Sequence, residues 1–200
     1  MSNRKRPPQT LSPKRARTRA RLLDAAVELF QRHGIAAVSL DEIASHAGLT
    51  KGAIYGNFKN KEDLIVAVAL ERVVRPRPIF TVDAPLRDQL STLVKQAAAT
   101  TPEAVKQMRF LIELDRYALM HETVRTRLRV FAEERYRKSA ENVEAVAKKG
   151  ELPLPPLQFA IAVHALMNGL LYQRAFFPDL VTDEVILTAL EALVNRIESA

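Results

Sequence analysis

The chain has 200 residues, enough for one or two domains with a buried core, and its 48% hydrophobic and 26% charged residues are typical of a soluble globular protein. It contains no cysteine, which excludes disulfides, thiolate catalysis and thiolate metal sites. No apolar run approaches the roughly 18 residues of a membrane span, and no apolar segment follows the basic N-terminus as a signal peptide requires.

Positive charge is concentrated near the N-terminus. Residues 1–64 hold twelve Lys or Arg against six Asp or Glu, whereas the following 136 residues hold eighteen against seventeen. Residues 1–21 alone carry eight basic side chains and no acidic one. This distribution indicates a polyanionic partner for the N-terminal part. Residues 1–13, with three prolines and no apolar periodicity, are predicted to be a basic flexible arm that can be disordered when free and still lie along DNA.

The first predicted helix runs from Lys14 to His33 and is stopped by Gly34. Its apolar positions recur at helical spacing: Leu22, Ala26, Leu29 and Phe30. Two short helices are too small to form their own core, so we expect this helix to brace the pair that follows it.

The stretch after it contains two short helices separated by a glycine. Ser39 and Glu42 have the spacing of a capping box, Gly48 can adopt the positive φ of a sharp turn, and Thr50 can cap the second helix. The apolar side chains assigned to packing are Ile43, Ala44, Ala47, Leu49, Ile54 and Phe58. This order predicts a helix-turn-helix, whose second helix lies in the major groove of DNA.

The rest of the chain is also predicted to be helical, so the fold class is all-α. Asn60, with Asp63 three residues later, opens a helix to about Val74, and Arg75–Pro78 is the best linker. No segment shows the alternation of a half-buried strand. Further helices are predicted at about 83–100, 102–119, 122–149, 156–177 and 183–198.

A known family shares this pattern. Tyr55, Phe58, Lys61 and Leu64 form Y-x-x-F-x-x-K-x-x-L, preceded by the sequence GLTKG at 48–52. Together with the first helix, they resemble the DNA-binding domain of the TetR family of bacterial transcription regulators, over roughly 17–73. The resemblance implies a three-helix DNA-binding domain at 14–74 and a larger helical domain at 83–200 that binds an effector and dimerises.

The predicted DNA-binding residues are those that packing leaves exposed, together with Ser39 and Lys61. The resemblance implies that Thr50, Tyr55 and Lys61 contact the DNA backbone. It places Lys51, Gly52 and Ala53 nearer the bases. The sequence departs from many members of the family at Gly56 and Asn57, where Asn57 could instead contact an adenine. Two alternatives stay open: Tyr55 could be a core aromatic residue, and Lys51 and Lys61 could simply be solvated. The predicted set is Ser39, Thr50, Lys51, Gly52, Ala53, Tyr55, Asn57 and Lys61.

A single recognition helix contacts few base pairs, so specific binding calls for a dimer that reads two half-sites. The last two predicted helices carry apolar faces, and the family pairs these helices at its dimer interface. Packing within one chain is the alternative. The predicted interface residues are Ala162, Ala165, Leu166, Gly169, Gln173, Ile186, Leu190, Leu193 and Ile197.

The family also implies a small-molecule pocket inside the second domain. Met and aromatic side chains at helical spacing can equally be ordinary core, and His164 can be a satisfied buried histidine. The predicted pocket residues are Phe110, Leu114, Tyr117, Phe131, His164, Met167 and Leu171.

The leading interpretation is a dimeric repressor in the bacterial cytoplasm, released from a double-stranded operator by a small-molecule effector. An architectural DNA-binding protein with its arm in the minor groove is the alternative. An enzyme is disfavoured because the sequence has no phosphate loop, nucleophile elbow or metal-ligand cluster, and we expect no cofactor. The sequence does not identify the effector, the operator or the regulated genes.

Overall fold

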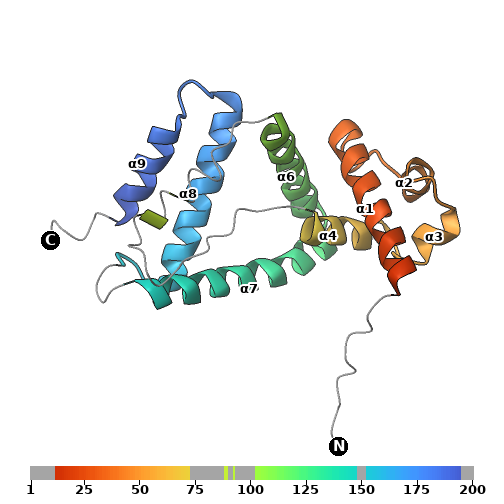
Figure 1. The fold of residues 1–200 in the computed structure, drawn as a ribbon, viewed down its shortest axis with the longest axis horizontal. Coiled ribbons are helices and arrows are strands. Elements are labelled where there is room, and N and C mark those ends of the chain that lie inside the picture. The colour runs from red at the N-terminus through yellow and green to blue at the C-terminus, as the bar shows by residue number, and fades with distance from the viewer. Residues whose placement is uncertain (1–11, 73–87, 90–91, 93–101, 148–151, 195–200) are drawn as a thin grey trace, which may run out of the picture. The chain divides into compact units, whose positions relative to one another are not determined.

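A computed structural model describes residues 12–72, 88–89, 92, 102–147 and 152–194. Every regular element within these ranges is a helix, which confirms the all-α prediction (Figure 1). The chain divides into two compact units, residues 1–72 and 73–200. None of the described helices combines the length and the apolarity that crossing a bilayer requires.

Residues 12–72 of the N-terminal unit form four helices: α1 (Pro13–His33), α2 (Leu40–His46), α3 (Lys51–Tyr55) and α4 (Lys61–Glu71). Helix α1 starts one residue earlier than predicted and packs against each of the other three, as expected of a brace. Helix α4 ends at Glu71, and the last two residues of its predicted range lie outside the described residues.

Each of these helices begins at a side-chain cap. The capping box of Ser39 and Glu42 is complete, and the Thr50 hydroxyl accepts a hydrogen bond from the Ala53 amide. Asn60 likewise caps α4, but Asp63 accepts its bond from the Lys59 amide instead of closing a second box. Local sequence signals therefore fix where these helices start.

The core of the N-terminal unit forms where α1 meets the other helices. Gly34 and Gly48 adopt φ of 82° and 63°, the left-handed region that only glycine enters easily, and so let the chain turn sharply after α1 and α2. The fully buried side chains include Leu22, Leu23, Ala26, Ile35, Ile43, Ile54, Leu64, Ile65 and Val68, while Phe30 and Phe58 are almost fully buried. The helix-turn-helix is thus supported by one continuous apolar core.

In the described part of the C-terminal unit there are four long helices: α6 (Pro102–Met120), α7 (Glu122–Val146), α8 (Pro156–Phe176) and α9 (Asp183–Val194). Of the helix predicted at 83–100, only residues 88, 89 and 92 are described, and they are helical. The predicted linker at 75–78 lies outside the described residues.

Helix α8 is central to this unit because it packs against α6, α7 and α9. A buried cluster joins α7, α8 and α9, and it comprises Val143, Phe159, Val163, Met167, Ile186 and Leu190. At the other end of α8, the buried Arg174 guanidinium forms an ion pair with Asp183 at the start of α9. An apolar cluster and an ion pair therefore hold α9 on α8.

Candidate functional site

Helix α3 presents one apolar face to the core and an opposite face to solvent. Ile54 is fully buried and Phe58, just after the helix, is 3% exposed. On the other side Tyr55 is 54% exposed, so it is no core aromatic, and Lys51 and Gly52 are exposed as well. A Cβ built at Gly52 would meet only the Thr50 hydroxyl, at 3.8 Å, so this surface has room for close approach.

A carboxylate from α2 contacts two of these exposed side chains. The Lys51 ammonium donates to Asp41 Oδ2 at 2.6 Å, and the Tyr55 hydroxyl donates to Asp41 Oδ1 at 3.4 Å. The hydrogen bond that Lys51 donates to Asp41 raises the pKa of Lys51. The sequence reasoning did not include Asp41, because nothing in the pattern of α2 shows which side chains of α3 it meets.

Four other predicted contact residues are engaged within the unit. Thr50 caps α3, Ser39 exchanges hydrogen bonds with Glu42, and the Asn57 amide donates to the Ala53 carbonyl at 2.8 Å. Lys61 donates to the Ala36 carbonyl at 2.9 Å, and burial lowers its pKa. These groups hold the helices in place, and DNA contact would have to use their other lone pairs or N–H groups.

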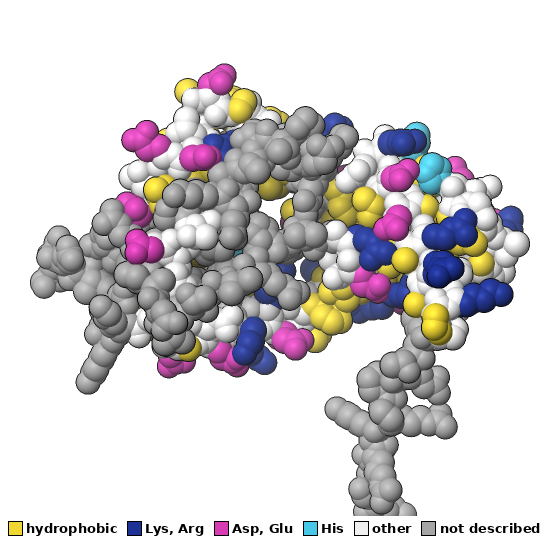
Figure 2. Space-filling model, in the orientation of Figure 1, with side chains coloured by type: hydrophobic (Ala, Val, Ile, Leu, Met, Phe, Trp, Pro, Cys, Tyr) yellow, Lys and Arg dark blue, Asp and Glu magenta, His cyan; other side chains and the backbone are white. Residues whose placement is uncertain are grey.

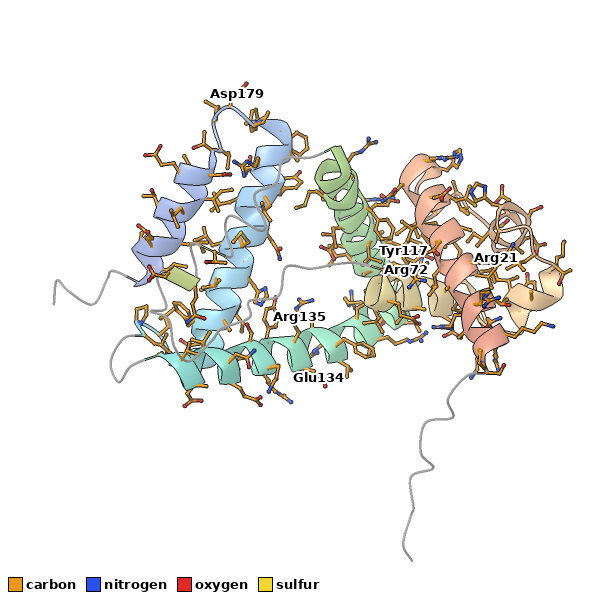
Figure 3. All side chains as sticks on the ribbon, viewed as in Figure 1. Arg21, Arg72, Tyr117, Glu134, Arg135 and Asp179 are labelled. Carbon is orange, nitrogen blue, oxygen red and sulfur yellow. The ribbon has the colours of Figure 1, made fainter. Side chains whose placement is uncertain are left out.

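Arginines of α1 connect the brace to the ends of the two short helices. Arg15 donates to the Gly56 carbonyl at 2.8 Å, at the C-terminal end of α3. Arg21, which Figure 3 labels on α1, donates to the Ala47 carbonyl at 2.7 Å, at the end of α2. Such carbonyls lack partners within their own helix, and a cation there also complements the helix dipole. The charge distribution predicted only a polyanionic partner for the N-terminal part and did not predict these structural roles.

Other cations of the N-terminal unit remain available to a polyanion. The side chains of Lys14, Arg17 and Lys59 are exposed and make no ion pair or hydrogen bond with the described residues. Figure 2 shows Lys and Arg side chains gathered over the N-terminal half of α1. Lys59 was not among the predicted contacts, although its place between α3 and α4 could have suggested it.

Comparison with known proteins assigns both parts of the chain. Residues 22–68 match the model of bacterial regulatory proteins of the tetR family, and residues 85–198 match the C-terminal model of BetI-type transcriptional repressors. The chain belongs to the TetR family. It is therefore a DNA-binding transcription regulator, and the exposed face of α3 is its candidate reading surface.

Individual relatives agree with this assignment. The transcriptional regulator SrpR of Pseudomonas putida is 32% identical over 163 residues, which cover 78% of this chain and 74% of SrpR. The regulator AcrR of Shigella flexneri is 53% identical over 47 residues, 24% of this chain and 22% of AcrR. Among solved structures, NalD of Pseudomonas aeruginosa is 25% identical, covers 92% of this chain and 99% of its own, and gives a TM-score of 0.66.

In the second unit of this TetR-family regulator, most of the predicted pocket residues are at least partly buried. Phe110, Leu114 and Tyr117 are buried on α6, whereas Met167 and the partly buried Leu171 belong to the cluster of α7, α8 and α9. The half-buried His164 ring meets Tyr136 of α7 edge-on, with centroids 5.3 Å apart.

Phe131 is the exception among the predicted pocket residues. Its side chain is 43% exposed, so the expectation that it points into the domain is wrong for the described chain. The buried residues of α7 are instead Val124, Ser139, Ala140 and Val143. A surface hollow of about 460 Å³ runs along another face of α7 and includes none of the predicted residues; its lining is Val130, Glu133, Glu134, Arg137, Lys138 and Glu141.

The predicted dimer residues fall into two groups. Ile186 and Leu190 of α9 are fully buried within their own chain, so their assignment to an intermolecular surface is wrong. Leu193 packs against the same cluster, and Ile197 lies outside the described residues. On α8, by contrast, Ala165, Gly169 and Gln173 are exposed, and Ala162 and Leu166 are partly buried.

The exposed side of α8 carries further apolar side chains outside the predicted interface. Ile161, Tyr172 and Phe176 are 41%, 38% and 60% exposed, and their spacing places them along one side of the helix with Ala165 and Gly169. We name these five residues the α8 stripe. An apolar stripe along a whole helix is typical of an interaction surface.

Proposed function

We propose that this protein is a dimeric repressor that leaves its DNA operator when a small molecule binds in the C-terminal unit. The observation that carries the proposal is the recognition helix: Lys51, Gly52 and Tyr55 are exposed on a short helix whose other face is locked into the core. Such a helix can enter the major groove without rearrangement. Cations on α1 and at Lys59 supply further phosphate contacts.

The repressing role is supported by the relatives. The family model that matches residues 85–198 describes transcriptional repressors, and NalD is described as the secondary repressor of a multidrug efflux pump. We also propose that this protein acts on DNA in the bacterial cytoplasm.

Dimerisation is supported by the α8 stripe. Small residues at its centre, Ala165 and Gly169, allow a second helix to approach closely, and Ile161 and Phe176 extend the apolar area toward the two ends. Two copies joined in this way present two recognition helices, which read half-sites about one helical turn apart.

Release is proposed to act through α4, the last helix of the DNA-binding unit. Near its C-terminal end, Arg72 donates to Asp24 at 2.7 Å and Arg19 of α1 donates to Glu71 at 2.6 Å. Because these contacts tie α4 to α1, we expect a displacement of α4 to move the helices of the DNA-binding unit together. Figure 3 shows Arg72 at the end of α4. The effector must bind the released state more tightly, and that affinity ratio sets the extent of release.

The first experiment selects an operator from a random duplex library and from fragments upstream of the gene itself, and then measures binding by fluorescence anisotropy. We expect the selected duplex to bind at least about 10³-fold more tightly than a scrambled one. The double variant Lys51→Ala, Tyr55→Ala should lose this preference. Lys138→Ala, which removes an exposed cation from α7, is the control and should retain it.

Equal binding to selected and scrambled duplexes with a steep salt dependence would contradict the proposal. That result would favour an architectural DNA-binding protein. The family assignment does not favour this alternative.

A further inference from the structure

The Asp41 carboxylate spans two side chains of the recognition helix. One oxygen accepts from the Lys51 ammonium at 2.6 Å and the other accepts from the Tyr55 hydroxyl at 3.4 Å. Asp41 belongs to α2, so these contacts join the first helix of the helix-turn-helix to the reading surface of the second.

These contacts contribute little to folding. The side chains of Lys51 and Asp41 are 73% and 40% exposed, and exposed ion pairs add little to stability because solvent screens them. The fold of the unit is secured elsewhere, by side-chain caps and by a closed apolar core. The effect of Asp41 should therefore be sought in DNA binding.

We propose that Asp41 is a specificity-determining residue that weakens binding to DNA of any sequence more than binding to the operator. The proposal rests on the DNA-binding function proposed above. Asp41 therefore changes the ratio between the affinity for the operator and the affinity for DNA of random sequence. A residue that only contacts the operator would change the operator affinity alone.

The physical reason lies in what each kind of DNA offers to Lys51. On a random duplex the attraction comes from phosphates, so Lys51 must exchange the carboxylate of Asp41 for a phosphate, and the carboxylate itself repels the DNA backbone. On an operator, the Lys51 ammonium has several N–H donors, and one can remain on Asp41 while another donates to a guanine edge. The carboxylate then orients the lysine and limits its rotamer freedom before binding.

The test compares Asp41→Asn with Glu122→Gln, which also neutralises an acid in the first turn of a helix but in the other unit. Both are titrated with a random-sequence duplex and with the selected operator over a range of NaCl concentrations. For the random duplex, Asp41→Asn should steepen the salt slope by about 0.9 and tighten binding about 8-fold at 0.1 M salt, the effect of one additional phosphate contact. Operator affinity should stay unchanged or fall, so that the specificity ratio drops by about 8-fold or more.

Two results would overturn the inference. In the first, Asp41→Asn binds the random duplex with the same affinity and the same salt slope as Glu122→Gln. The other is equal tightening on both duplexes, which would make Asp41 only a negative charge near DNA. Asp41→Ser is a second neutral variant that suits the first turn of a helix, and it should repeat the result if Asn disturbs α2.

A double-mutant cycle then tests the assigned contact. With Lys51→Ala in place, Asp41→Asn should steepen the salt slope much less, because the cation that it releases is gone and only the repulsion by the carboxylate is removed. Persistence of the full effect would overturn the role of the Lys51 pair. A wild-type protein without sequence preference would instead refute the proposed function, and the random-duplex titration would still decide whether Asp41 restrains phosphate binding.

Discussion

The two units of this chain are stabilised in different ways. In the N-terminal unit all four helices begin at side-chain caps, and arginines of α1 close the ends of α2 and α3. In the C-terminal unit neither α7 nor α8 has a side-chain cap, and α8 exposes an apolar stripe along its length. Helix α9 does begin at such a cap, since the Val185 amide donates to the Thr182 hydroxyl at 3.4 Å. Side-chain caps thus mark every described helix start in the first unit, whereas the second unit relies more on the packing of long helices.

This difference fits the roles proposed for the two units. A DNA-binding unit must hold its recognition helix rigidly. Helix α3 has five residues, and a helix of that length is not stable alone, so caps and cross-helix hydrogen bonds are needed. A dimerising and ligand-responsive unit needs long apolar surfaces whose partners can change. The following predictions test whether this separation holds.

The largest effect should follow from opening the core of the C-terminal unit. Ile186 is fully buried against α7 and α8, so Ile186→Ala should lower the free energy of unfolding by about 2–5 kcal/mol. The neighbouring Val185 is 42% exposed, and Val185→Ala should change stability by less than about 0.5 kcal/mol. Urea unfolding followed by circular dichroism measures both, and equal losses would contradict the burial of Ile186.

The next effect separates the α8 stripe from the core. A Cβ built at Gly169 meets no heavy atom within 4 Å, so Gly169→Leu should fold normally and gain helix propensity. In a dimer joined through α8 the leucine would prevent the two helices from approaching closely. We expect the dimer dissociation constant to rise about 100-fold, which corresponds to about 2.7 kcal/mol of binding free energy. Sedimentation equilibrium measures the change, with Gly169→Ala as the smaller step. An unchanged dimer would place the interface elsewhere.

The two units also differed in how far the sequence predicted them. The caps at Ser39, Thr50 and Asn60 and the turn at Gly48 are local features, and the structure confirms them. Helical periodicity in the C-terminal unit predicted which residues are apolar and share a face, but not what covers that face. For that reason Ile186 was assigned to a dimer surface although it packs in its own chain.

The candidate site shows the same limit. The exposure of Tyr55 could be predicted because Phe58 already fills the apolar side of the helix. The pairing of Lys51 with Asp41, and that of Lys61 with the Ala36 carbonyl, depend on distances between residues ten and twenty-five positions apart. Such distances follow from the packing of α2, α3 and α4, and the periodicity of one helix does not contain them.

A smaller effect should follow from removing a cap in the N-terminal unit. Ser39→Ala eliminates the side-chain acceptor of the capping box and should lower the free energy of unfolding by about 1 kcal/mol. Ser45→Ala, at an exposed position of the same helix, provides the control. Thermal unfolding of the isolated variants measures both, and a loss no greater than that of the control would show that the cap is dispensable.

Removing the arginine that closes α3 should have a modest effect on DNA binding. Arg15→Ala loses one hydrogen bond to the Gly56 carbonyl, so operator affinity should fall by about 3-fold to 10-fold, corresponding to roughly 1 kcal/mol. The salt slope should stay the same, because Arg15 is assigned to position α3 and not to bind phosphate. A slope reduced by about 0.9 would instead identify a phosphate contact.

The smallest effect concerns acid stability. Hydrogen bonds from the Ser39 side chain and backbone lower the pKa of Glu42. The folded-state pKa therefore lies below the unfolded-state value of about 4.3, so the contribution of Glu42 is complete above that pH and is lost as the pH falls through the folded-state pKa. Glu42→Gln should flatten the decline of stability in this acidic range, which unfolding at several pH values measures. An unchanged slope would mean that other carboxylates determine it.

The contact between Asp41 and the reading side chains also bears on how operator preference evolves. The side chains that α3 exposes add nothing to the core, so selection can replace them at little cost in stability. Lys51 and Tyr55 are not independent, however, since both are bonded to one carboxylate on another helix. A lineage that acquires a new operator should therefore change position 41 together with positions 51 and 55, and grafting α3 alone into another regulator would transfer its preference incompletely.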